Sequence, residues 1–305
     1  MKLKCLISLF CISICFLSMA QEHRKQPVVM EFKPFFNIQE DNLRFNISGD
    51  ISGGSPNILS EISWRNIFST VGGLGLSLNV FRFSLESSYS YGNAFAGSAT
   101  DRDYAEDDRK GMFSDQYLNS DKGTVREILI QPKYLILRKS EISFSMYSIF
   151  QFTEQSLYLM NKVAQDNQDY IKGLNSSYSY SNKAVGIGLE ISAETGRVTF
   201  LSRLKMGKVF YKASGNWNLR SDLEQPTSYS HNARGKSVGL EIEARYRITS
   251  RFYYFMNCSL LAERSRDGVD RLFRVNKAPY ETMLNEVDRQ QSVFRAGILI
   301  LTNLN

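Results

Sequence analysis

Residues 238–248 read Val-Gly-Leu-Glu-Ile-Glu-Ala-Arg-Tyr-Arg-Ile, and two kinds of side chain alternate along this stretch. Every second residue from Val238 onward is apolar, whereas the residues between them are Gly, Glu, Glu, Arg and Arg. A period of two belongs to the β-strand, because successive side chains of a strand point to opposite faces. The stretch therefore predicts a strand with one apolar face and one charged face.

The same alternation recurs along most of the chain. From Phe81 to Tyr91 the odd positions are mainly aromatic or apolar and the even positions are polar. No run of about 18 apolar residues follows residue 40, so the sequence predicts no membrane-spanning helix there. With the two stretches above, eight comparable segments bring the predicted strands to ten: 43–51, 62–80, 125–138, 142–152, 185–192, 198–211, 252–263 and 293–301.

The connections between these strands alternate in length. Tight turns are predicted at 79–82, 138–141, 193–197 and 249–252, and long polar loops at 97–123, 158–181, 214–234 and 264–288. Short turns at one rim and long loops at the other are typical of up-and-down transmembrane barrels. A soluble β-sandwich or lipocalin-like barrel is the alternative, but its strands usually have about 5 to 6 residues, whereas a tilted membrane span needs roughly 9 to 11. We predict an all-β protein with a ten-stranded antiparallel up-and-down transmembrane barrel over residues 41–305.

Residues 1–20 have the pattern of a signal peptide. Lys2 and Lys4 precede an apolar run that ends in Ser18-Met19-Ala20, with small residues at the −3 and −1 positions before Gln21. A retained anchor helix is the alternative, but the run is shorter than the roughly 20 residues that a span requires. We therefore expect the signal peptide to be cleaved during export and the mature chain to insert into the outer membrane.

Composition restricts the remaining choices. Hydrophobic residues make up 43% and aromatic residues 12% of the chain, which excludes a disordered tail. Three of the four cysteines lie in the leader, so Cys258 alone remains and no internal disulfide can form. Loss of Lys2 and Lys4 lowers the net charge from +6 to +4, and the scattered basic residues give no nucleic-acid patch. Residues 21–40 allow three interpretations: the stretch from Val28 to Ile38 extends the first strand, lies in the periplasm, or adds strand pairing at one end of the barrel.

The polar faces of the predicted strands define what would fill a barrel interior. Both charge signs occur there, and ten strands enclose too little space for a wide aqueous pore once long side chains enter. We expect an internal ion-pair network that blocks ready permeation; a small channel is the alternative. The residues assigned to the interior are Arg44, Asp50, Arg65, Arg82, Glu86, Arg203, Lys205, Glu241, Glu243, Arg245 and Arg247.

Two short motifs resemble a known family. The segment 59–64 reads Leu-Ser-Glu-Ile-Ser-Trp and the segment 100–104 reads Thr-Asp-Arg-Asp-Tyr. With the strand order and loop lengths over about residues 40–302, they resemble the omptins, ten-stranded outer-membrane endopeptidases with an active site among their extracellular loops. The resemblance implies that Asp101 and Asp103 form one half of that site. Two neighbouring carboxylates can hold a water and divide their proton affinities, so that one acts as a base.

The other half of the omptin site departs from the family pattern. Asn216 and Asn218 stand where omptins have an Asp-x-His pair, and an amide side chain cannot accept a proton near neutral pH. His231 at the far end of the same loop is either a displaced base or a solvated loop histidine. A solvated loop is also the alternative interpretation for Asp101 and Asp103, because four charged residues follow at 107–110. The acidic position that receives basic substrate side chains falls on Ser214, and the first loop at 53–57 offers no Glu.

The partners expected from the sequence are outer-membrane lipids and a peptide or protein ligand at the extracellular loops. Omptins require lipopolysaccharide, and Phe152, Glu154 and Ser156 retain part of the aromatic, acidic and basic pattern that holds it; Glu154 is the implied contact. No metal or other cofactor is expected, because no His/Cys cluster has metal-binding spacing. A monomeric state is also expected. We predict an omptin-like barrel without proteolytic activity whose loops bind or have a structural role. Active omptin-type aspartic endopeptidase and small channel are the alternatives.

Overall fold

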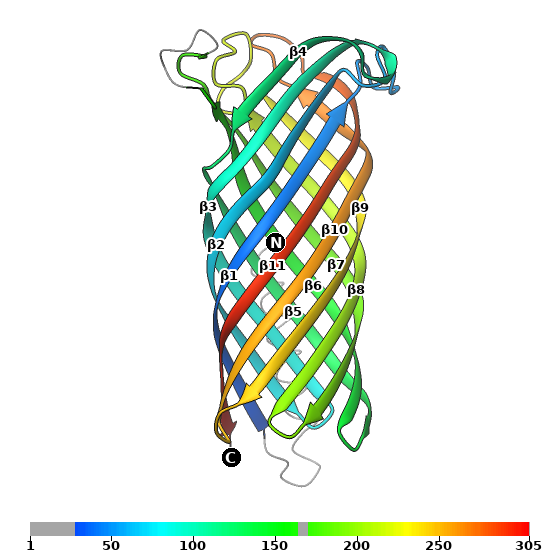
Figure 1. Cartoon of the computed structure of the whole chain (residues 1–305). Helices are drawn as coiled ribbons and strands as arrows, with labels where there is room; N and C mark the ends of the chain where they lie inside the picture. Colours follow the sequence, from blue (N-terminus) through cyan, green and yellow to red (C-terminus); the bar gives the residue numbers. More distant parts are fainter. Residues whose placement is uncertain (1–27, 164–169, 305) are drawn as a thin grey trace.

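The computed structural model describes residues 28–163 and 170–304, so the predicted signal peptide lies outside the described residues. The described chain is all-β, with eleven strands and one short 3-10 helix (Figure 1). None of its helices is long and apolar enough to cross a membrane. The elements are β1 Val28–Ile47, β2 Ser60–Val80, β3 Phe83–Glu106, η1 Asp107–Arg109, β4 Lys110–Asn119, β5 Gly123–Lys139, β6 Ile142–Asn161, β7 Asn175–Thr195, β8 Val198–Asn216, β9 Tyr229–Arg247, β10 Phe252–Leu272 and β11 Tyr280–Leu304.

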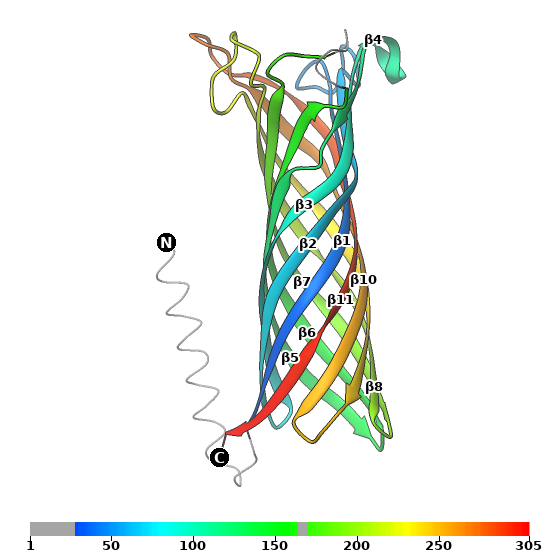
Figure 2. The ribbon, with the colours of Figure 1, turned by 60° about the vertical axis from the view of Figure 1, so that its left-hand side comes forward.

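Ten of these strands form a closed antiparallel ring. Each pairs with its neighbours along the chain, and β11 returns to pair with β1 from Val28↔Leu304 to Ile47↔Leu284. The eleventh strand, β4, lies above the start of β5 and pairs with β3 over Ser98–Glu106. Tight turns lie at one end of the barrel and the long connections at the other, called here the turn end and the loop end (Figures 1 and 2). The predicted ten-stranded barrel is confirmed.

The strands are longer than the sequence pattern indicated. β3 has 24 residues and β11 has 25, and strand pairing continues into segments that were expected to be loops. Asp101 and Asp103 consequently lie on β3 itself. Strand pairing continues beyond the apolar pattern because its hydrogen bonds join backbone groups, which every residue carries. Cross-strand charge pairs such as Arg102 with Asp115 further stabilise the β3–β4 ribbon, which has no apolar alternation. β1 begins at Val28, so residues 28–38 form its first half.

The outer surface of the ring has a broad apolar belt. Large apolar side chains remain exposed on successive strands, for example Phe36 at 52%, Ile187 at 57% and Ile242 at 53%. Such a surface is costly in water and favourable in hydrocarbon, as expected of a barrel wall that faces lipid.

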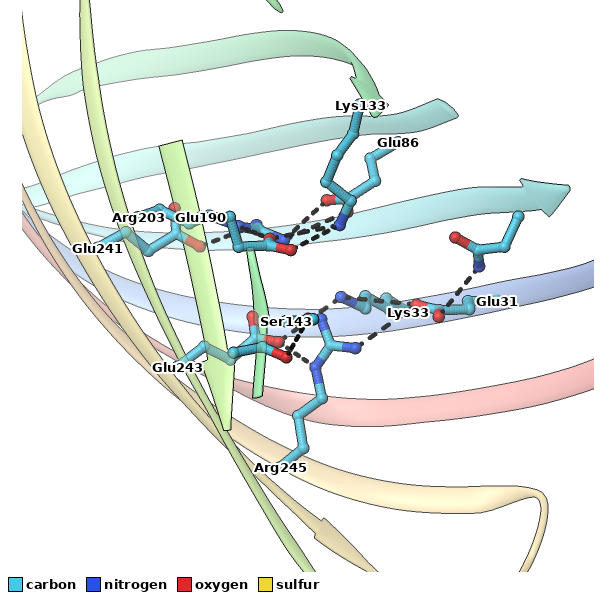
Figure 3. Close-up of polar contacts among 12 residues, drawn as sticks. Glu31, Lys33, Glu86, Lys133, Ser143, Glu190, Arg203, Glu241, Glu243 and Arg245 are labelled. Atoms are coloured by element: carbon cyan, nitrogen blue, oxygen red, sulfur yellow. Dashed lines mark hydrogen bonds and ion pairs between the residues drawn. The ribbon is translucent and has the colours of Figure 1, made fainter. Parts of the chain in front are cut away.

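The interior of the barrel is filled by two groups of side chains. Near the loop end lies the loop-end aromatic cluster, defined as Phe45, Trp64, Tyr178, Tyr211, Tyr229 and His231. Near the turn end lies the turn-end ion-pair cluster, defined as Glu31, Lys33, Glu86, Lys133, Glu190, Arg203, Glu241, Glu243 and Arg245 (Figure 3). Between them the buried Arg289 guanidinium donates to Asp41 Oδ1 at 2.8 Å and to Glu263 Oε2 at 3.1 Å.

Candidate functional site

The two predicted carboxylates lie side by side on the inner face of β3 near the loop end. Asp101 is the cross-strand partner of Ile62 on β2, a buried residue of the barrel interior, and Asp103 is the partner of Ser60. Cross-strand partners share a face, and residues two apart on a strand share it as well. Both carboxylates therefore point toward the same space above the aromatic cluster.

Burial raises the pKa of both carboxyl groups above that of an ordinary aspartate. Desolvation, and in second place the charge of Asp103, raise the pKa of Asp101 to about 7. Asp101 Oδ1 is buried and has no hydrogen-bond partner among the described residues. Burial also raises the pKa of Asp103, although hydrogen bonds from the Ser60 and Ser114 hydroxyls and the charge of Arg220 oppose this. Asp101 is thus divided between its acid and base forms near neutral pH and can exchange a proton with a bound water.

The two asparagines lie at the end of β8 and in the loop that follows it. Asn218 Oδ1 accepts hydrogen bonds from the Asn175 backbone N–H at 3.0 Å and the Ser176 hydroxyl at 3.1 Å, while its Nδ2 donates to the Gly173 carbonyl at 2.7 Å. Asn218 therefore ties the β8–β9 loop to the β6–β7 connection. Asn216 Oδ1 is buried and unpartnered within the described chain. No described interaction across 28–163 and 170–304 joins either asparagine to Asp101 or Asp103.

His231 is neither solvated nor in a loop. It lies on β9 inside the barrel and is 3% exposed. Its Nε2 is 3.1 Å from Asp270 Oδ1, and its Nδ1 is 2.8 Å from the Tyr178 hydroxyl. Asp270 was not recognised from the sequence. Only the register of β9 against β10, which places His231 opposite Asp270, identifies this pair.

The aromatic rings around His231 close the barrel beneath the carboxylates. Tyr178 stacks on Trp64 with ring centroids 5.0 Å apart and on Tyr229 at 6.1 Å, and Phe45 contacts the His231 ring edge-on at 4.5 Å. Trp217 of the β8–β9 loop extends the stack above Tyr229 at 5.6 Å. The His231–Asp270 pair is thus covered from the loop end by aromatic side chains.

At the turn end, the predicted interior charges meet in pairs. Arg203 lies 3.1 Å from Glu86, 2.5 Å from Glu190 and 3.2 Å from Glu241 (Figure 3). Lys133 bonds the first two carboxylates from β5, and Arg245 pairs with Glu243. Lys205 extends toward Gln151 at 3.5 Å.

Five residues assigned to the interior lie elsewhere. Arg44 is on the outer wall, where it pairs with Glu286 and Asp288, and Arg65 is exposed on β2. Asp50 lies in the β1–β2 connection, and Arg82 and Arg247 lie near turns at the other end. The assignment of Arg44 was wrong because the outer wall above the apolar belt faces water, so polar residues point outward there and apolar residues such as Phe45 point inward.

Glu154 lies on the outer wall of β6 and pairs with Arg126 of β5. The two residues border a surface hollow of about 520 Å³ that Tyr91, Lys212 and several serine hydroxyls also line. Within the described chain, no group of three or more His, Cys, Asp or Glu side chains is arranged to hold a metal ion.

Residues 36–295 match the model of the family described as Pom, Protochlamydia outer membrane protein. The chain belongs to this family. Its localisation in the outer membrane, expected from the strand pattern, follows from this Pom membership and from the fold. No curated protein sequence matches the chain.

Among solved structures, the Pom chain is similar to the outer membrane protease OmpT of Escherichia coli. The TM-score is 0.68 at 11% sequence identity, and the match covers 91% of this chain and 97% of OmpT. The translocator domain of the autotransporter NalP from Neisseria meningitidis matches with a TM-score of 0.40 at 7% identity, over 96% of this chain and 95% of that one. The likeness to OmpT is a likeness of fold, which is an omptin-like ring of ten antiparallel strands.

Proposed function

We propose that this Pom protein is an omptin-like outer-membrane barrel that lacks omptin proteolysis and acts through its extracellular loops as a binding or structural surface protein. The proposal rests on Asn218, which the resemblance to the omptins places at the position of their histidine. Its amide nitrogen donates to Gly173 of the β6–β7 connection at 2.7 Å, and its amide oxygen accepts from Asn175 and Ser176 at the start of β7 at 3.0 and 3.1 Å. An amide so engaged neither accepts a proton from water nor is free to orient one.

The size of the lost contribution supports an inactive site. General-base catalysis accounts for about 10²- to 10⁴-fold in rate, and Asn at both positions supplies no replacement. Asp101 and Asp103 remain as a carboxylate pair that can bind a water, which leaves a weak residual hydrolysis as the most that this half alone supports.

Proteolysis remains the second candidate because of the His231–Asp270 pair. His231 Nε2 lies 3.1 Å from Asp270 Oδ1, although this contact does not have hydrogen-bond geometry. The charges of Asp101 and Asp270 both act on Tyr229. The side chain of His231 is 1% exposed, however, so a peptide would reach it only after displacement of the aromatic rings above it.

A peptide-cleavage assay with added lipopolysaccharide tests the proposal. We expect no cleavage by the native protein and a gain of cleavage in the double variant Asn216→Asp/Asn218→His. Robust native cleavage that disappears in Asp103→Ala would contradict the proposal, and its disappearance in His231→Gln would assign the base to His231.

For the membrane partner we propose that the outer-wall hollow beside Glu154 receives an anionic lipid headgroup, with lipopolysaccharide as the candidate. Arg126, which pairs with Glu154, and Lys212 give this hollow two positive charges against one negative charge, and serine hydroxyls supply hydrogen bonds. Copurified lipid phosphate should fall in the variant Arg126→Ala/Lys212→Ala relative to the native protein. Equal phosphate content in both would contradict this contact.

A further inference from the structure

The β3–β4 ribbon rises above the ring and is held firmly in place. Asn57 of the β1–β2 connection binds the tip of the ribbon: its backbone N–H donates to Asp107 at 2.7 Å and its side-chain oxygen accepts from the Asp108 N–H at 2.9 Å. Arg109 pairs with Glu61 of β2 at 2.7 Å. The ribbon is therefore fixed to the barrel at its far end as well as at its base.

One edge of this ribbon has no strand beside it. β4 pairs with β3 on one side, whereas on the other side only Leu118 and Asn119 pair, with Asn161 and Met160 of β6. Residues 110–117 have no partner strand on that side within 28–163 and 170–304. In Figure 1, β4 runs along the top of the barrel on the side of β3 away from β2, so the free edge faces away from the apolar belt.

The ribbon also exposes large apolar side chains, and its edge is poorly shielded. Three large apolar side chains of β4 are exposed: Met112 at 52%, Phe113 at 67% and Tyr117 at 58%. Two strands alone are marginally stable, and natural edges are usually shielded by proline, bulges or charge. Residues 110–117 contain no proline and two charged residues, Lys110 and Asp115, of which Asp115 pairs with Arg102 at 2.8 Å. A bulge at Phe113 is the one device in this stretch that interrupts the edge.

We propose that the free edge of β4, residues 110–117, is a docking site for an extended segment of a partner polypeptide, which adds a third strand to the ribbon. The inference deepens the proposed function, on which it rests, by naming the class of ligand that the outer loops bind. Backbone amides of the partner complete the unpaired edge, and its apolar side chains pack beside Phe113 and Tyr117. Because the ribbon is already fixed, the ribbon itself loses little conformational entropy when the third strand is added.

The probe that tests this inference is a fluorescein-labelled peptide, Lys-Thr-Val-Thr-Val-Thr-Val-Lys, added to the full-length protein in detergent micelles. We expect saturable binding by fluorescence anisotropy. A peptide of the same sequence built with D-valine has the same composition but cannot form a regular strand, and it should bind at least 10-fold more weakly. Equal binding of the two peptides, or no binding of the first, would overturn the inference.

Two variants test the position of the site. Phe113→Ser/Tyr117→Ser should weaken binding about 10-fold, whereas Leu219→Ser, which removes a 47% exposed side chain from the β8–β9 loop, should leave binding unchanged. Unchanged binding in the first variant would overturn the proposed location. Mass spectrometry of the recovered peptide separates the two proposals, because a cleaved peptide contradicts the absence of proteolysis and an intact, unbound peptide contradicts the docking site.

Discussion

Replacement of Arg203 by methionine tests how far the turn-end ion-pair cluster stabilises the barrel. Arg203 is 7% exposed and bonds three carboxylates, Glu86, Glu190 and Glu241. In the native protein Lys133 is the other cation on this group, so three negative charges face two positive ones. Without Arg203, Glu86 and Glu190 keep only Lys133 of these two cations, and Glu241 loses the ion pair that it makes within the described chain.

The expected cost follows from that imbalance. Removing one partner of a buried ion pair typically destabilises a protein by about 3 to 5 kcal/mol, because the remaining charge is left without compensation. This corresponds to roughly 10²- to 10⁴-fold in the unfolding equilibrium constant. The double variant Arg203→Met/Glu190→Gln removes one of the uncompensated charges and should recover part of the loss.

Urea unfolding in detergent, followed by tryptophan fluorescence and by gel mobility of the folded barrel, measures these changes. Arg264→Met is the matched control, because Arg264 is 58% exposed on the outer wall and pairs with Asp288 at 2.6 Å. Such an exposed pair contributes about 0 to 1 kcal/mol. A loss of stability in Arg203→Met no larger than in Arg264→Met, or a double variant less stable than Arg203→Met, would show that the buried charges do not stabilise the barrel in this way.

Two further changes test the loop end. Burial raises the pKa of Asp101 from 3.8 to about 7, so the folded state retains a proton that the unfolded state releases, and the stability from that proton is lost as pH rises through 7. Asp101→Asn should therefore increase the free energy of unfolding by up to about 4 kcal/mol at pH 8.5 and by less at pH 5, whereas exposed Asp267→Asn should change neither; an equal gain at both pH values would contradict this. Trp64→Ala should destabilise the barrel by about 3 to 5 kcal/mol in the same urea assay, because Trp64 is 0% exposed; a loss below 1 kcal/mol would show that the cluster is loosely packed.

The strand number and the tight turns were predictable because they depend on local pattern. Alternation with period two and the position of a turn are both written in neighbouring residues, and the turns between β2 and β3 and between β7 and β8 lie where the sequence placed them. The interior position of Arg203 followed from the same alternation, since the apolar residues Phe200, Leu204 and Met206 of the opposite parity face outward.

The remainder depended on contacts between strands that the sequence does not specify locally. Glu190 of β7 pairs with Arg203, and Lys133 of β5 pairs with the same carboxylate. Asp270 meets His231 only through the β9–β10 register. Arg44 was misplaced because the polarity of the two wall faces reverses above the apolar belt. Segments without apolar alternation, including β4, gave no strand signal, although backbone pairing extends through them.

Planar-bilayer recording of the purified native protein is the most direct test of the central claim, that this barrel is closed and works through its outer end. The loop-end aromatic cluster and the turn-end ion-pair cluster fill the interior in succession, with Arg289 bonded to Asp41 and Glu263 between them. With insertion verified by gel mobility of the folded protein, we predict no steady conductance. Steady conductance in the nanosiemens range from the native protein would contradict the claim and favour a channel.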